Sequence, residues 1–110
     1  MIQIPMRDQN SFVIEAGLED VTFFLRFDWN SEAGIWVMGI ANARNEDIIR
    51  GLSLVPNTPL LEQFRHLAVP AGEFVVYAND DDLRIGRDTF LTGAAALYYL
   101  TEAEVAALQS

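Results

Sequence analysis

The segment from residue 21 to residue 40 most constrains the fold of this chain. Apolar side chains fall at every second position from Val21 to Trp29, and a period of two is typical of a β-strand with one buried face. Turn-forming residues occupy positions 30–34, and a second apolar run begins at Ile35. Two such runs joined by a short connection that contains glycine predict a β-hairpin.

Apolar runs bounded by turn residues predict further strands along the chain. They lie at residues 11–14, where Gly17 ends the strand, and at residues 48–55, 73–78 and 96–100. Polar turns are predicted at residues 42–47 and 79–82, and residues 83–95 are predicted to be loop with one short extended piece.

Two helices are also expected. Thr58 is a helix cap with Pro59 at the first helical position, and residues 60, 61, 64 and 67 form an apolar stripe, so a helix is predicted over residues 58–67. Thr101 and Glu104 have the spacing of a capping box, which predicts a short C-terminal helix.

These elements together predict a mainly β fold. We expect a small antiparallel β-barrel or sandwich of five to six strands, with one inserted short helix and the short C-terminal helix. A length of 110 residues fits a single domain over residues 1–110. The expected core includes Trp29, Trp36, Leu61 and Phe64.

Charge and composition exclude several classes of protein. The net charge is −9 and all seven cations are arginine, which argues against direct binding of nucleic acid because such binding requires neutralised phosphates. No apolar run approaches the roughly 20 residues of a membrane span, and the first residues do not have the pattern of a signal peptide. The chain has no cysteine, so disulfide and thiolate chemistry are excluded.

Residue types that could perform catalysis or bind metal are present but poorly arranged. Asp80, Asp81 and Asp82 lack the spacing of a calcium loop and are typical of a solvated turn. His66 is the single histidine and has no catalytic partner in the pattern. A glycosidase pair among the carboxylates at positions 15, 19, 20 and 28 is disfavoured because these residues lie at strand ends. We therefore predict no enzyme activity, no cofactor and no metal.

The tryptophans and tyrosines leave two interpretations open, a platform for a bound ligand and a contact with another subunit. Trp29 or Trp36 could stack against a sugar, although their place in alternating runs favours the core or a subunit contact. Tyr98 and Tyr99 point to opposite faces of an extended strand, so one of them should reach solvent or a partner. Tyr98, Tyr99 and Arg65 are therefore candidates for subunit contacts.

Six short motifs occur in order along the chain. They are Trp29-Asn30 at the end of the long alternating strand, Gly34-Ile35-Trp36, Gly51-Leu52-Ser53-Leu54-Val55, Leu60-Leu61-Glu62-Gln63-Phe64, Pro70-Ala71-Gly72-Glu73-Phe74-Val75 and Leu97-Tyr98-Tyr99-Leu100. In this order the chain resembles the small baseplate plug proteins of contractile-tailed phages, typified by the plug of a cyanophage minimal baseplate. The resemblance extends from about Gln9 to Leu100.

The resemblance implies a structural protein of the virion that acts by binding alone. Its expected partners are the hub, tube-initiating and sheath-initiating proteins of the tail baseplate, with several copies around the tail axis and assembly in the cytoplasm of the bacterial host. A small ligand-binding or carbohydrate-binding β module without catalysis is the alternative that the residues leave open, and an acidic mimic of DNA is a further one.

Overall fold

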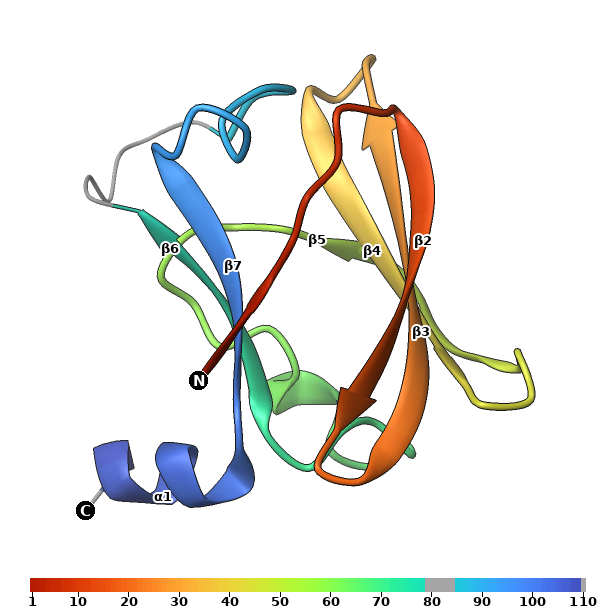
Figure 1. Ribbon diagram of the computed structural model, residues 1–110, viewed down its shortest axis with the longest axis vertical. Helices are drawn as coiled ribbons and strands as arrows, with labels where there is room; N and C mark the ends of the chain where they lie inside the picture. Colours follow the sequence, from red (N-terminus) through yellow and green to blue (C-terminus); the bar gives the residue numbers. More distant parts are fainter. Residues whose placement is uncertain (79–84, 110) are drawn as a thin grey trace.

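Two antiparallel sheets face each other across the core of the protein (Figure 1). The computed structural model describes residues 1–78 and 85–109. The strands are β1 (Ile2–Ile4), β2 (Ser11–Leu18), β3 (Val21–Asn30), β4 (Ile35–Asn42), β5 (Asp47–Ser53), β6 (Glu73–Ala78) and β7 (Ala95–Leu100). A 3-10 turn, η1 (Glu62–Phe64), and a helix, α1 (Glu102–Gln109), complete the described elements.

The strand order separates the chain into two layers. One sheet has the order β2-β3-β4-β5 and the other has the order β1-β7-β6. The fold is therefore mainly β, as predicted, and within the described residues it is a sandwich of two open sheets. The described strands number seven, because β1 pairs with β7 and was not predicted.

The central hairpin is confirmed. β3 and β4 pair without interruption, and Trp29 lies directly opposite Trp36. Their rings are 5.6 Å apart between centroids, so the two side chains pack against each other on the inner face.

The first long strand extends further than predicted. β2 continues through Gly17 to Leu18, which pairs with Val21 of β3. The chain reverses at Glu19 and Asp20 instead, with φ angles of 54° and 68°. Two successive residues with positive φ are typical of the tight turns that match the twist of a β-hairpin.

The helix predicted over residues 58–67 is too long, because this segment forms only the 3-10 turn η1 and its beginning bonds to β6. The backbone N–H groups of Asn57 and Leu60 donate to the carbonyls of Val76 and Phe74, at 2.7 and 3.1 Å. The N–H groups of Phe64 and Leu67 then donate to the carbonyls three residues earlier, each at 2.9 Å, which is the pattern of a 3-10 turn and not of an α-helix. Only η1 is therefore helical here, in place of the two to three α-helical turns that the apolar spacing predicts.

The capping-box prediction is confirmed at the C-terminal helix. The backbone N–H of Glu104 donates to the hydroxyl of Thr101 at 3.2 Å, and the Glu104 carboxylate accepts from the Thr101 N–H at 3.0 Å. Both contacts satisfy N–H groups that the first turn of a helix leaves unpaired. α1 lies beyond the end of β7 (Figure 1).

The connection between β6 and β7 is described only in part. The turn predicted at residues 79–82 lies outside the described residues. Residues 87–93 form turns, as the loop prediction requires, and the extended piece expected there is absent from the described residues 85–94.

A single apolar layer fills the space between the sheets. Its largest fully buried side chains are Trp36, Tyr99, Phe27 and Phe74. Inner-face residues of both sheets belong to this one cluster, since a sheet buries one face and a sandwich buries the two facing ones.

Gly72 is required by the close approach of two backbone segments. A Cβ atom at this position would lie 1.9 Å from the carbonyl oxygen of Leu100. We expect Gly72→Ala to lower the free energy of unfolding by about 3 kcal/mol or more, because backbone atoms cannot move aside easily. Urea denaturation followed by tryptophan fluorescence measures this loss.

Gly17→Ala is the matched control. A Cβ atom at Gly17 meets no atom of the described residues within 4 Å, so the same chemical change should alter stability by less than about 1 kcal/mol. Equal effects of the two substitutions would contradict the close packing at Gly72.

Candidate binding surface

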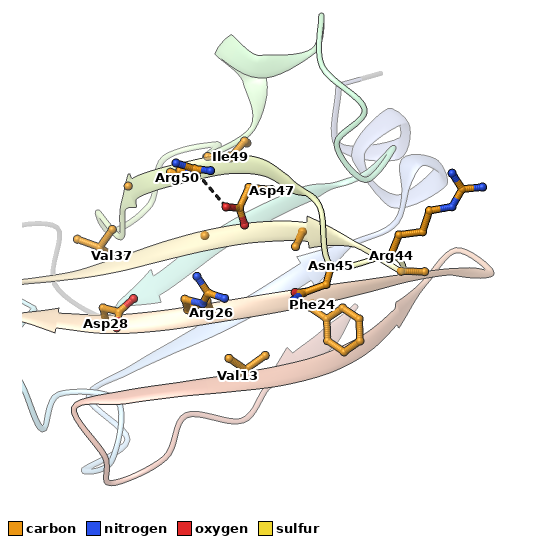
Figure 2. Close-up of a pocket in the computed structure, with 14 residues that line it drawn as sticks. Val13, Phe24, Arg26, Asp28, Val37, Arg44, Asn45, Asp47, Ile49 and Arg50 are labelled. Atoms are coloured by element: carbon orange, nitrogen blue, oxygen red, sulfur yellow. Dashed lines mark hydrogen bonds and ion pairs between the residues drawn. The ribbon is translucent and has the colours of Figure 1, made fainter.

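The outer face of the four-stranded sheet contains a hollow of about 840 Å³ (Figure 2). It runs across all four strands of this sheet and includes the turn between β4 and β5. Val13, Phe24 and Val37 supply apolar side chains to its lining. This face points away from the core, so the hollow is open to a partner.

Small residues explain why the sheet is hollow there. Gly39 and Ala41 occupy outward positions of β4, and Gly51 lies on neighbouring β5. Larger side chains of the flanking strands surround these positions.

A break in the pairing of β5 shapes the same region. Ile49 pairs with Ile40 and Leu52 pairs with Met38, so Arg50 and Gly51 together oppose one residue of β4. Gly51 has a φ of 76°, a conformation that glycine adopts at such a β-bulge.

Arginines are concentrated at the hollow although the chain is strongly acidic. Arg26, Arg44 and Arg50 are three of the seven basic residues of the chain, and two aspartates accompany them in the lining. Arg50 is paired with Asp47 at 2.9 Å. Arg26 and Arg44 have no ion pair with any residue that the structure describes, and both are exposed.

Hydrogen bonds of Asn42 hold the turn that carries Arg44. The side-chain oxygen of Asn42 accepts from the backbone N–H groups of Arg44 and Glu46, each at 2.9 Å. The side-chain amide of Asn42 also donates to the Glu46 carboxylate at 3.1 Å. This turn was predicted as polar, and its side-chain bonds place Arg44 at the rim of the hollow.

Neither tryptophan lines the hollow. Trp36 is 1% exposed, its ring N–H donates to the carbonyl of Arg87 at 3.3 Å, and the Arg87 guanidinium lies over the ring. Trp29 is partly buried and packs against the same core. The two residues expected in the core therefore lie in it or against it, and neither forms an outer aromatic platform.

The remaining residues expected in the core lie beside β6. Leu61 is fully buried and Phe64 is partly buried against the core. The backbone N–H of Leu61 donates to the buried carboxylate of Glu73, which also accepts from the N–H of Phe74. Sequence reasoning missed Glu73, because its polarity predicts an exposed residue.

Arg65 is engaged within its own chain. Its guanidinium donates to the carbonyls of Pro70, Ala71 and Gly72 and pairs with Glu73 at 3.3 Å. The side chain is still 40% exposed. A subunit contact through Arg65 stays a prediction.

The two tyrosines of β7 point to opposite faces, but Tyr99 is the inner one. Tyr99 is completely buried, so the prediction that it contacts a neighbouring subunit is wrong. Tyr98 is partly exposed on the outer face of the three-stranded sheet and remains a candidate contact.

The hydroxyl of Tyr99 joins the two sheets at one end of the sandwich. It donates to the carboxylate of Glu19 in the β2–β3 turn and accepts from the N–H of Gly72 at 2.8 Å. Glu19 also accepts from the N–H of Glu102 at 3.0 Å. Glu19 is one of the carboxylates weighed for a glycosidase pair, and in this structure it holds the two sheets together.

Other candidates for chemistry are dispersed. His66 is exposed, and Asp28 accepts a hydrogen bond from the Ser11 hydroxyl at 2.6 Å. Within residues 1–78 and 85–109, no group of three or more His, Asp or Glu residues is placed to hold a metal ion. The three aspartates at 80–82 lie outside the described residues. No helix of the described chain is long and apolar enough to cross a membrane.

The ionisation of Glu19 gives a test of the contact between the sheets. Its pKa lies below the ordinary value of 4.5, chiefly because Tyr99 donates to the carboxylate and next because the Glu102 N–H does. The pKa of Tyr99 is raised, first by burial and then by the bond to Glu19. Because folding favours the ionised Glu19, its contribution to stability is complete above pH 4.5 and is lost as the pH falls through the lowered pKa.

We therefore expect Tyr99→Phe to lower the free energy of unfolding by about 1–3 kcal/mol near neutral pH, with a smaller loss at acid pH. Denaturation curves across the acid range measure the difference, with Tyr98→Phe as the matched control. A loss for Tyr99→Phe that stays constant down to low pH would contradict the bond to an ionised Glu19.

Comparison with known proteins identifies the family. A family model described as the cyanophage baseplate Pam3 plug gp18 matches residues 1–102. No curated protein matches the chain. Because the family model spans nearly the whole sequence, this chain belongs to the family of cyanophage baseplate plug proteins.

Proposed function

We propose that this protein is a plug that packs between the hub, tube-initiating and sheath-initiating proteins of a contractile phage tail baseplate. It acts by binding alone, in several copies around the tail axis. Membership of a baseplate plug family supports a structural role in the virion tail. The identity of the neighbours, their number and assembly in the host cytoplasm are part of the proposal.

The hollow on the outer sheet face is the observation that carries this proposal. It has an apolar floor and two arginines without ion pairs in the described chain, on a protein whose net charge is −9. Exposed arginines beside apolar side chains are typical of surfaces that bind another protein. We propose that carboxylates of a neighbouring baseplate protein face Arg26 and Arg44.

The carbohydrate-binding alternative is less well supported. That interpretation requires an exposed tryptophan as a stacking platform. Trp36 is buried and Trp29 packs against it, so neither indole offers a free face beside the hollow. The outer lining instead combines aliphatic, charged and small residues with a single aromatic, Phe24.

Charge reversal at the hollow tests the proposal. We expect Arg26→Glu to reduce incorporation of the plug into tails by about tenfold or more, because it places like charges against each other. Phage lacking the plug gene are complemented with each variant, and plug content is measured in purified tails. Circular dichroism confirms that the variant is folded.

Arg7→Glu is the control with the same change in net charge. Arg7 is exposed and lies outside the hollow. Equal incorporation of Arg26→Glu and wild type would rule out the hollow as the contact. If phage that lack the plug gene assemble normal tails without any plug, the baseplate role itself is ruled out.

A further inference from the structure

The outer edge of β2 is a regular strand without a partner in the described part of the chain. β2 forms one margin of the four-stranded sheet, and its eight residues pair with β3 in unbroken register. It contains no proline, no lysine and no bulge. Such an edge presents a row of unpaired backbone groups to any extended chain.

The register shows which backbone groups are free. Leu18 and Val21 close a two-residue turn, so these two residues exchange backbone hydrogen bonds. Along an antiparallel pair, hydrogen-bonded and non-hydrogen-bonded residue pairs alternate. The even-numbered residues of β2 therefore bond to β3. The N–H and C=O groups of Val13, Glu15 and Gly17 point away from the sheet.

The other sheet edges are protected. β5 is interrupted by register shifts, and β1 is only three residues long. The edge of β6 is covered by the backbone N–H groups of Asn57 and Leu60. Since natural sheets protect their edges by these devices, the long unbroken edge of β2, where Glu15 is the single charged residue, is the exception.

The core is also incompletely covered beside β2. Ile14 and Ala16 face the core but are only partly buried, whereas their partners on β3, Leu25 and Phe23, are 0% and 5% exposed. A further strand beside β2 would cover Ile14 and Ala16 with its own inward side chains, because directly opposed residues share one face of a sheet.

We infer that an extended segment of a neighbouring baseplate protein adds to β2 as a fifth strand. The segment is apolar where it faces Ile14 and Ala16, and cationic where it faces Glu15, because opposite charges across a strand pair are stabilising. This inference rests on the proposed function for its setting, and it assigns the partner's conformation and charge.

Charge argues against a second copy of this chain as the occupant. Two copies each carry a net charge of −9 and repel one another. Two-fold pairing centred on Glu15 would also place two carboxylates directly opposite each other.

Hydrogen exchange in assembled tails tests the inference. The segment of residues 11–18 is compared by mass spectrometry in the free full-length protein and in purified tails. We expect the outward amides of Val13, Glu15 and Gly17 to exchange at least about tenfold more slowly in tails, since each gains a hydrogen-bonded partner. If the plug is present in tails but this segment exchanges as in the free protein, the inference fails and the baseplate role stands.

Substitutions at Glu15 separate the backbone contact from the charge. Glu15→Pro removes one outward N–H and leaves the ladder to β3 intact, whereas Glu15→Gln keeps that N–H. We expect incorporation into tails to fall about tenfold for the proline variant and to change little for the glutamine variant. Unchanged incorporation of Glu15→Pro would overturn the strand addition.

Glu15→Lys tests the charge of the segment. This substitution keeps the N–H and reverses the charge, so it should weaken incorporation more than Glu15→Gln. Incorporation equal to wild type would show that the segment is not cationic at this position. Slowed exchange of residues 11–18 in the purified protein alone, increasing with its concentration, would assign the edge to a second copy and overturn the inference.

Discussion

Each sheet of this protein can bury only one of its two faces, and the buried faces of the two sheets pack against each other. The strands therefore direct their large apolar side chains into one shared layer, with Trp36, Phe27, Phe74 and Tyr99 at its centre. Buried polar atoms are accommodated only where they find partners. The hydroxyl of Tyr99 bonds to Glu19 and Gly72, which ties a turn of one sheet to a strand of the other.

Because the inner faces of both sheets are buried, contacts with other proteins have to use the outer faces and the edges of the sheets. The outer face of the four-stranded sheet contains small residues where β4 and β5 meet, together with exposed arginines that have no ion pair in the described chain. The free edge of β2 borders the same face, since Val13 belongs to both. This member of the baseplate plug family thus combines a shared apolar core with an adjoining hollow and strand edge, which we propose as its contacts with neighbouring chains.

Local patterns predicted most of the strands, and long-range pairing explains what they missed. The hairpin of β3 and β4 follows from period-two alternation, and α1 follows from the capping box at Thr101. The helix predicted over residues 58–67 is reduced to the 3-10 turn η1, and Leu60 before this turn bonds to β6, a contact that local spacing does not reveal. The hollow was missed because Arg26 and Gly39 become neighbours only through strand register.

The burial of Tyr99 was missed for a similar reason, because its buried hydroxyl depends on partners far away in the sequence.

Electron cryo-microscopy of an intact tail tests the account most directly. We expect the outer face of the β2–β5 sheet to be covered by a neighbouring chain, with carboxylates at Arg26 and an added strand along β2. A plug whose outer sheet face and β2 edge are both open to solvent in the assembled tail would contradict it.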